Sequence, residues 1–235
     1  MKVLWQQIAS PIITEIFCKS NFDGVVFDLE HGCFNPETLY SCIQVCTLSK
    51  KTSLIRVTDV DKTTIRMALD AGCKGVILST AECGDRADEF CSYCRYPPKG
   101  TRGQGLVREN FWGEKDIIES QNNPILIAQI ETKEGAGSVK VLATLPFDYF
   151  LIGPYDLSAS LGQVGVFDSA EYIYTLKKIA KAIPLSKMGY HVVKDIEDQI
   201  KNPQISNCGF LALSLDTLML INGVKQAERV SYDLY

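Results

Sequence analysis

The sequence predicts one α/β domain, a single (β/α)8 (TIM) barrel that spans residues 1–235. Eight apolar strand patterns alternate with helical patterns, and 235 residues is roughly the length that eight such repeats need. No linker or low-complexity segment interrupts the alternation. The main alternative is a doubly wound open sheet. The absence of a G-x-G-x-x-G turn after the first strand, and of any P-loop, argues against it.

Each expected strand is a short apolar run rich in β-branched residues and bounded by turn residues. We expect these strands at 3–5, 24–29, 53–57, 75–78, 125–130, 149–153, 187–191 and 209–213. The intervening helices are expected at 10–19, 35–48, 61–71, 82–94, 133–145, 156–162, 169–182, 195–201 and from 216 onward. Ser10-Pro11 and Asn35-Pro36 each place a capping residue before a proline at the first helical position. Asp61 caps the third helix, and Gly72 ends it.

Residues 95–123 break the alternation. The segment RYPPKGTRGQG is basic and rich in Pro and Gly, and only 112–120 has a helical pattern. A strandless insertion of this length in a compact domain is typical of a functional loop.

Composition and charge narrow the classes of partner. The net charge of −4 argues against nucleic acid as the main partner. No run approaches the ~20 apolar residues that a membrane span needs, and the N-terminus MKVLWQQIAS is too short and polar for a signal peptide. The nine cysteines include one C-x-x-C pair but no second pair at zinc spacing, which favours buried thiols. We therefore expect a cytoplasmic protein without a membrane partner.

The segment 124–162 is the centre of the prediction. Two apolar runs, ILIAQI and YFLIG, flank a helical segment and are each followed by a carboxylate, Glu131 and Asp156. Parallel strands end at the same edge of a sheet, so the two carboxylates should lie close together there. Such a pair is a plausible site for a hard cation. The structural alternatives are a solvated Glu131 at a strand end and an N-capping role for Asp156.

Other polar residues lie at the ends of the second and third expected strands. Asp28 ends the run GVVFD, Glu30 and His31 follow shortly after it, and Arg56 interrupts the apolar run SLIRV. Burying a guanidinium is costly without an anion. That anion could be Asp28, Glu30 or a substrate carboxylate held by two hydrogen bonds. His31 is either a catalytic base or a loop histidine with local hydrogen bonds.

Two further residues, in other expected elements, give weaker evidence of a role. His191 has no acidic neighbours, so we expect a structural role for it. Asp70 lies late in a helix, where its charge opposes the helix dipole and favours a specific partner.

Missing residues also limit the chemistry. No Lys stands at the carboxyl end of an expected strand, which argues against a Schiff base. No G-x-S-x-G motif or Cys–His signature of a nucleophile occurs. A cation held by carboxylates, an anion-binding Arg and a nearby His suit enolate chemistry, in which a metal polarises a keto oxygen and a base removes the adjacent proton.

At these residues the sequence resembles the HpcH/HpaI aldolase family of metal-dependent (class II) 2-keto-acid aldolases. The resemblance runs from Ser10-Pro11 to about Gly223. It rests on FDGVVFDLEHG (22–32), IRV (55–57), ALDAGCKGVI (68–77), RYPPKGTRG (95–103), IAQIETKEG (127–135), IGPYDLSASLG (152–162) and LALSLDT (211–217). It implies a barrel of the phosphoenolpyruvate/pyruvate-domain type and a carbon–carbon lyase (aldehyde-lyase). The implied reaction is reversible cleavage of a 4-hydroxy-2-keto acid to pyruvate and an aldehyde.

The resemblance also implies roles for individual residues. Glu131 and Asp156 match the ligands of a divalent cation, Mg²⁺ or Mn²⁺ with Co²⁺ also accepted, and Arg56 matches the clamp for the pyruvate carboxylate. His31 matches the acid/base, tuned by Asp70. The remaining matches are pocket positions, namely Gln129, Gly153, Pro154 and Tyr155.

The family assembles as a hexamer of dimers with an exchanged last helix, so we expect a homo-oligomer, a hexamer or a dimer. This chain has Leu78-Ser79, followed by Thr80, where the family usually has Val-Pro at the end of the fourth strand. Two alternatives remain open: a CoA-ester lyase of the citrate lyase β-subunit kind, which would need a basic surface on the 95–108 loop, and a catalytically silent keto-acid-binding barrel.

Overall fold

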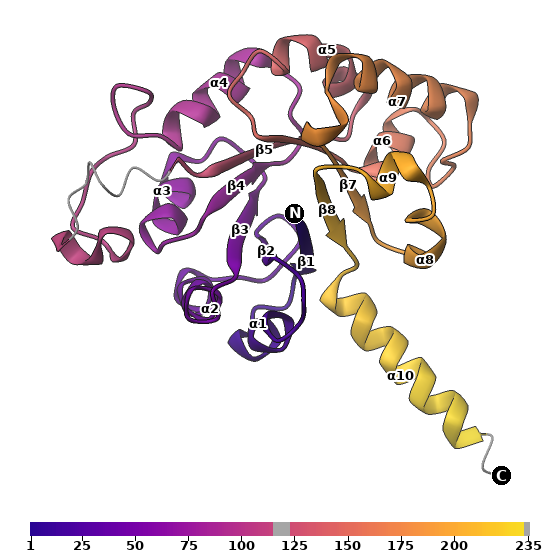
Figure 1. The fold of residues 1–235 in the computed structure, drawn as a ribbon, viewed down its shortest axis with the longest axis horizontal. Coiled ribbons are helices and arrows are strands. Elements are labelled where there is room, and N and C mark those ends of the chain that lie inside the picture. Colours follow the sequence, from indigo (N-terminus) through magenta and orange to yellow (C-terminus); the bar gives the residue numbers. More distant parts are fainter. Residues whose placement is uncertain (115–122, 233–235) are drawn as a thin grey trace.

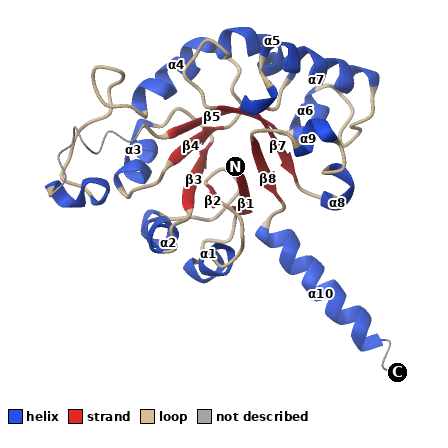
Figure 2. Cartoon of the chain, viewed as in Figure 1, coloured by secondary structure: helices blue, strands red, loops and turns tan. Residues whose placement is uncertain are grey.

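The computed structural model describes residues 1–114 and 123–232 and shows a closed barrel of eight strands in sequence order. All neighbouring strands pair in parallel, including β8 with β1. Helices surround the strands on the outside (Figures 1 and 2). The expectation of a (β/α)8 barrel is therefore confirmed.

The strands are short, as in the sequence prediction, and the helices vary in length. The strands are β1 Lys2–Gln6, β2 Gly24–Asp28, β3 Thr52–Val57, β4 Gly75–Leu78, β5 Ile125–Ile130, β6 Tyr149–Ile152, β7 Met188–Val192 and β8 Phe210–Leu213. The α-helices are α1 Pro11–Cys18, α2 Pro36–Leu48, α3 Lys62–Asp70, α4 Gly84–Tyr93, α5 Lys133–Leu142, α6 Pro154–Ser160, α7 Ala170–Ala182, α8 Ile196–Gln199, α9 Pro203–Ser206 and α10 Asp216–Tyr232. Two 3₁₀ helices, Arg108–Gly113 and Leu185–Lys187, complete the described elements.

The strands separate two apolar cores. Alternate residues of a strand face opposite sides, so one set fills the barrel and the other packs beneath the helices. The inner core consists of Val3, Trp5, Val26, Leu54, Ile77, Ile127, Leu151, Phe210 and Ala212. A larger core lies between the barrel and the helices. The filled interior closes the barrel below its carboxyl end and leaves the functional residues to the mouth.

Several helix starts follow the capping signals of the sequence. The side chains of Asn35, Asp61 and Thr132 accept hydrogen bonds from backbone N–H groups in the first turns of α2, α3 and α5. Ser10 precedes Pro11 as expected, but its side chain makes no capping hydrogen bond. Of the two expected features, only the proline contributes to the start of α1, because its fixed φ suits a first helical turn.

The described part of the insertion after α4 contacts the end of α3. Arg102 is buried there, with its Nη2 atom 2.8 Å from Asp70 Oδ1 and 2.8 Å from Glu109 Oε2. The helical pattern expected at 112–120 falls mainly on residues outside the described ranges. Within the described part, a 3₁₀ helix covers Arg108–Gly113, and Phe111 and Trp112 have positive φ angles.

The last helix points away from the barrel rather than packing over β8 (Figure 1). Apolar residues of α10 are exposed, among them Leu220, Ile221 and Val224. Within the described residues, no helix is long and apolar enough to cross a membrane.

Candidate active site at the carboxyl mouth of the barrel

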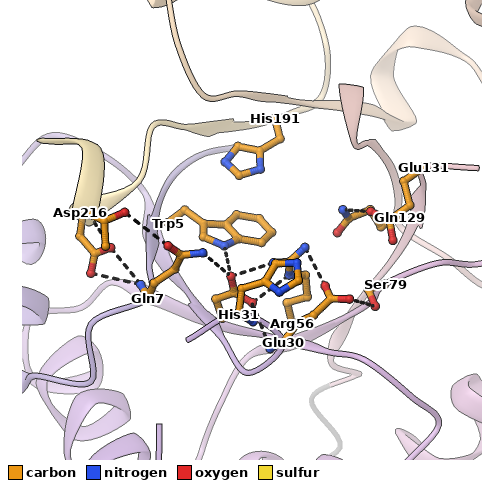
Figure 3. A network of polar contacts seen from close by, with 12 residues as sticks. Trp5, Gln7, Glu30, His31, Arg56, Ser79, Gln129, Glu131, His191 and Asp216 are labelled. Atoms are coloured by element: carbon orange, nitrogen blue, oxygen red, sulfur yellow. Dashed lines mark hydrogen bonds and ion pairs between the residues drawn. The ribbon is translucent and has the colours of Figure 1, made fainter. Parts of the chain in front are cut away.

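Polar residues of the mouth continue the inward-facing positions of the strands. Because inward positions recur every two residues, the residues that follow the inner core along each strand face the mouth. Val26 is followed by Asp28 and Glu30, Leu54 by Arg56, Ile77 by Ser79, and Ile127 by Gln129 and Glu131. Figure 3 shows the contacts of Glu30 with Arg56 and Ser79, with Gln129 and Glu131 to one side of them. The expectation that the strand ends gather the candidate residues holds for this group.

Asp28 is the centre of the polar network. It is fully buried, and its carboxylate accepts hydrogen bonds from Arg56 Nε (2.9 Å) and Nη2 (2.7 Å), Trp5 Nε1 (3.2 Å) and Gln7 Nε2 (3.1 Å). The backbone N–H groups of Glu30 and His31 also donate to it. Burial alone would raise the pKa of Asp28, but the hydrogen bonds and charge of Arg56, with Gln7 and Trp5, hold it at about 2. Asp28 is therefore ionised and fixes the site around it.

Arg56 is held by acidic residues of the chain itself. Besides the two hydrogen bonds to Asp28, its Nη1 atom lies 2.8 Å from Glu30 Oε2, and the guanidinium stacks over Trp5 at 5.0 Å. Pairing of Arg56 with Asp28 and Glu30 is one of the alternatives that the sequence left open. The bonds to Asp28 use two of the five N–H donors of the guanidinium and the contact with Glu30 uses a third, so two donors remain for a further anion.

Glu131 is buried and is bound on both of its oxygens. Oε1 accepts from the backbone N–H (2.8 Å) and hydroxyl (2.5 Å) of Thr80, and Oε2 accepts from Gln129 Nε2. Burial raises the pKa of Glu131, the Thr80 hydroxyl lowers it, the charges of Glu30 and Asp156 raise it, and the charge of Arg56 lowers it. Two other carboxylates and one guanidinium therefore act on Glu131.

Two features beside Glu131 leave space and acceptors at its Oε2 atom. Gln129 Oε1 is buried and has no hydrogen-bond partner among the described residues. Gly153 lies so close that a Cβ atom there would be 3.0 Å from both Glu131 Oε2 and Gln129 Nε2. An acceptor without a donor is costly in a buried position, so Gln129 Oε1 favours a cation or a donor group at this point.

The residues after β6 line the same side. Gly153 precedes α6, which begins at Pro154 and includes Tyr155 and Asp156 in its first turn. Asp156 is exposed and stands inside the helix rather than before it. The N-capping alternative for Asp156 is therefore wrong, because the N-cap position belongs to Gly153.

Glu131, Asp156 and Gln129 Oε1 together fit a hard divalent cation. All three offer oxygen, and Mg²⁺ commonly takes one or two carboxylates while keeping water and substrate ligands. The described residues contain no group of three or more His, Cys, Asp or Glu side chains that could hold a metal ion.

His31 and Asp70 do not meet within one chain. His31 is exposed in the loop after β2, at the carboxyl end of the barrel. Asp70 ends α3 and leads to Cys73 and Lys74, which bond to Ser53 O at the amino end of β3. The helix thus carries Asp70 to the opposite end of the barrel, where it pairs with Arg102. Within one chain, Asp70 therefore does not contact His31, and the tuning of His31 by Asp70 stays a prediction.

Sequence reasoning missed several members of the network. Trp5 and Gln7 bind Asp28, and Asp216 accepts the backbone N–H groups of Gln7 and Ile8 (Figure 3). The two-residue inward period of β1, extended past its last residue, could have placed Trp5 and Gln7 at the mouth.

His191 is buried and stacks on Trp5 with ring centroids 4.4 Å apart. Its burial lowers its pKa to about 4. The histidine is therefore neutral at physiological pH and packs as a core ring, in accord with the structural role expected for it.

Comparison with known proteins identifies relatives over almost the whole chain. A family model described as HpcH/HpaI aldolase/citrate lyase matches residues 2–222. A hydroxypyruvate/pyruvate aldolase of Roseobacter denitrificans is 29% identical over 93% of this chain and 87% of the relative. A 5-keto-4-deoxy-D-glucarate aldolase of Salmonella paratyphi A is 31% identical over 74% of this chain and 70% of the relative.

Solved structures confirm the fold. An HpcH/HpaI aldolase/citrate lyase family protein from Burkholderia cenocepacia superposes with a TM-score of 0.89 at 23% identity, covering 99% of this chain and 94% of that one. The citrate synthase SbnG superposes with a TM-score of 0.85 at 22% identity, covering 99% and 93%. Likeness at such identity concerns the architecture alone.

Proposed function

Because the chain belongs to the HpcH/HpaI aldolase/citrate lyase family, we propose that it is a carbon–carbon lyase of the class II pyruvate aldolase type. It would reversibly cleave a 4-hydroxy-2-keto acid to pyruvate and an aldehyde, with a divalent cation, Mg²⁺ or Mn²⁺, as cofactor. Aldolases of keto acids among its relatives support the reaction class. The observation that carries the proposal is the buried Glu131 in contact with Gln129, whose Oε1 is buried and unpartnered, with the charge of the buried Arg56 acting on Glu131.

Glu131 and Asp156 would hold the cation, with Gln129 beside them. When bound, the cation supplies Lewis-acid polarisation of the keto oxygen. Its two carboxylate ligands would be too few to fill its coordination, so the keto acid and water would complete it.

Arg56 would bind the carboxylate of the keto acid through N–H donors that Asp28 does not use. Trp5 and Asp28 hold the guanidinium in one orientation, so little conformational freedom would be lost when the substrate binds. Gly153, Pro154 and Tyr155 would meet the keto acid with the backbone at the start of α6, since Gly153 admits close approach.

His31 would move the proton at the hydroxyl of the cleaved substrate. It is exposed at the mouth, its backbone is fixed by Asp28, and its imidazole makes no hydrogen bond with a described residue. A positioned base of this kind contributes typically ~10²–10⁴-fold to the rate.

We further propose a homo-oligomer, a hexamer or a dimer. The projecting α10, with its exposed apolar residues, would pack on another copy as the last helix does in the family. Asp70 could act at His31 only across such an interface, because within one chain the two lie at opposite ends of the barrel.

The CoA-ester lyase alternative has less support. Its basic surface would come from the 95–108 loop, but three arginines of this loop are engaged within the chain. Arg95 donates to Pro146 O, Arg108 donates to Ala71 O, and Arg102 is buried against Asp70 and Glu109. They are therefore poorly placed to bind the phosphates of CoA.

The function is tested by incubating metal-supplemented protein with pyruvate and a panel of aldehydes and identifying products by mass. The proposal predicts new masses equal to pyruvate plus one aldehyde, formed only when the divalent cation is present. Acetyl-CoA consumption without any pyruvate adduct would favour the CoA alternative. The absence of turnover together with keto-acid binding would favour a silent barrel.

A further inference from the structure

Thr80, the second residue after β4, has a backbone conformation that is unusual for its type. Its φ angle is +50°, in the left-handed region. A β-branched residue rarely adopts this region, because its side chain crowds the backbone, and such strain persists only where other contacts hold it. Glycine would adopt the same conformation without this cost. The chain therefore keeps a strained threonine at the mouth, and its contacts should explain why.

Those contacts converge on a single atom, Glu131 Oε1. The backbone N–H of Thr80 donates to Oε1 at 2.8 Å, and its hydroxyl donates to the same oxygen at 2.5 Å. In this conformation the backbone and the side chain of one residue both reach one acceptor. The preceding residue, Ser79, donates its hydroxyl to Glu30 Oε1 at 3.2 Å. The Ser79–Thr80 pair thus connects the Arg56 network with Glu131.

Each oxygen of an ionised carboxylate offers about two acceptor positions. The two donors of Thr80 fill both positions on Oε1. Gln129 Nε2 fills only one position on Oε2, which lies beside Gly153. The remaining acceptor position of Glu131 is therefore on Oε2.

We propose that Thr80 is a positioning residue, which saturates Glu131 Oε1 and so directs Oε2 of this carboxylate to the divalent cation. The inference rests on the proposed function, because it assumes that Glu131 is a metal ligand. It adds a residue to which the family resemblance assigns no role. Partners that orient a metal ligand typically change metal affinity by about 10–100-fold when they are removed.

A purely structural role for Thr80 predicts a different pattern. If the residue only completes the loop, Thr80→Gly should relieve the backbone strain and leave metal binding unchanged. If Thr80 positions Glu131, the same substitution should weaken metal binding even though the protein is equally or more stable. Metal affinity and stability together distinguish the structural role from the positioning role. Relief of backbone strain changes stability, whereas loss of the hydroxyl changes the position of Glu131 and so the metal affinity.

The experiment measures Mn²⁺ affinity without substrate, by counting free Mn²⁺ with electron paramagnetic resonance, together with Tm for each variant. We expect Thr80→Ser to bind within about threefold of wild type, since it keeps both donors. Thr80→Val and Thr80→Gly should each bind about 10–100-fold more weakly. Thr58→Val is the matched control. Thr58 follows the neighbouring strand, is exposed, and makes no side-chain hydrogen bond with a described residue, so its Mn²⁺ affinity should equal that of wild type.

Glu131→Ala separates the two levels of the proposal. If wild-type protein binds Mn²⁺ and Glu131→Ala does not, the assumed metal ligand is supported whatever the Thr80 variants do. Wild-type affinity in both Thr80→Val and Thr80→Gly would then overturn the positioning role alone. A wild-type protein that binds no Mn²⁺ would overturn the proposed cofactor and this inference with it.

Discussion

Replacing Asp28 with asparagine tests the network that holds Arg56. The substitution keeps the size of the side chain but removes its charge. It also turns an amide NH₂ toward donors that now share the carboxylate, among them Arg56 Nη2, Trp5 Nε1 and Gln7 Nε2. Arg56 would keep only Glu30 as an ion-pair partner. We expect Asp28→Asn to lower the free energy of unfolding at pH 7 by about 3–5 kcal/mol, the usual cost of breaking a buried ion pair.

The pH dependence gives a sharper magnitude. The pKa of Asp28 falls from 3.8 to about 2 on folding, which corresponds to about 2 kcal/mol of stability because the group is fully buried. A depressed carboxylate pKa stabilises the fold above the pKa of the unfolded chain. This contribution is lost as the pH falls through the pKa of the folded state. The difference between wild type and Asp28→Asn should therefore be constant above about pH 5 and shrink by about 2 kcal/mol between pH 4 and pH 2.

Urea denaturation followed by circular dichroism, at a series of pH values, measures this difference. The difference isolates Asp28, because other groups that titrate in acid, such as His191, are present in both proteins. Asp198→Asn is the control. Asp198 forms an exposed pair with Lys201, and such pairs contribute ~0–1 kcal/mol. A stability difference for Asp28→Asn that does not change between pH 7 and pH 2 would refute the assignment of a depressed pKa to Asp28.

Three further predictions concern the chemistry. Arg56→Lys should raise KM for pyruvate about tenfold or more, because a lysine cannot replace paired guanidinium hydrogen bonds; an unchanged KM in steady-state assays would leave Arg56 with only its internal partners. His31→Ala should lower kcat by ~10²–10⁴-fold while Mn²⁺ affinity stays near wild type; wild-type kcat with the wild-type pH–rate profile would assign the proton transfer to another group. Asp156→Ala should abolish metal-dependent turnover without lowering Tm, because Asp156 is exposed; full activity of the chelated Asp156→Ala protein would exclude Asp156 as a ligand of a required cation.

The fold could be predicted because its signals are local and repeated. Apolar runs such as ILIAQI and GVVFD predict buried strands, and proline or glycine marks where many helices begin or end. The parallel barrel then follows from the alternation, and it places Glu131, Arg56 and Asp28 at one end. These positions depend only on which strand a residue follows.

The partner of each side chain could not be predicted in the same way. Asp70 was expected at His31, but its helix runs toward the opposite end of the barrel, where Arg102 of the insertion binds it. That pairing joins residues from two elements whose relative positions no sequence period describes. Thr80 stands out in the sequence only as part of a departure from the family pattern, while its positive φ and its bonds to Glu131 are visible only in the structure. Local patterns thus predict where a residue lies, while its contacts depend on tertiary packing.

The role of a divalent cation at Glu131 in forming the pyruvate enolate can be measured without knowledge of the aldehyde. Pyruvate is incubated with the protein in D₂O, and deuterium in its methyl group is followed by mass spectrometry. We expect exchange with wild-type protein and Mg²⁺ or Mn²⁺, and none above the background rate after chelation or with Glu131→Ala. Exchange that persists at the wild-type rate in chelated Glu131→Ala protein would contradict this role.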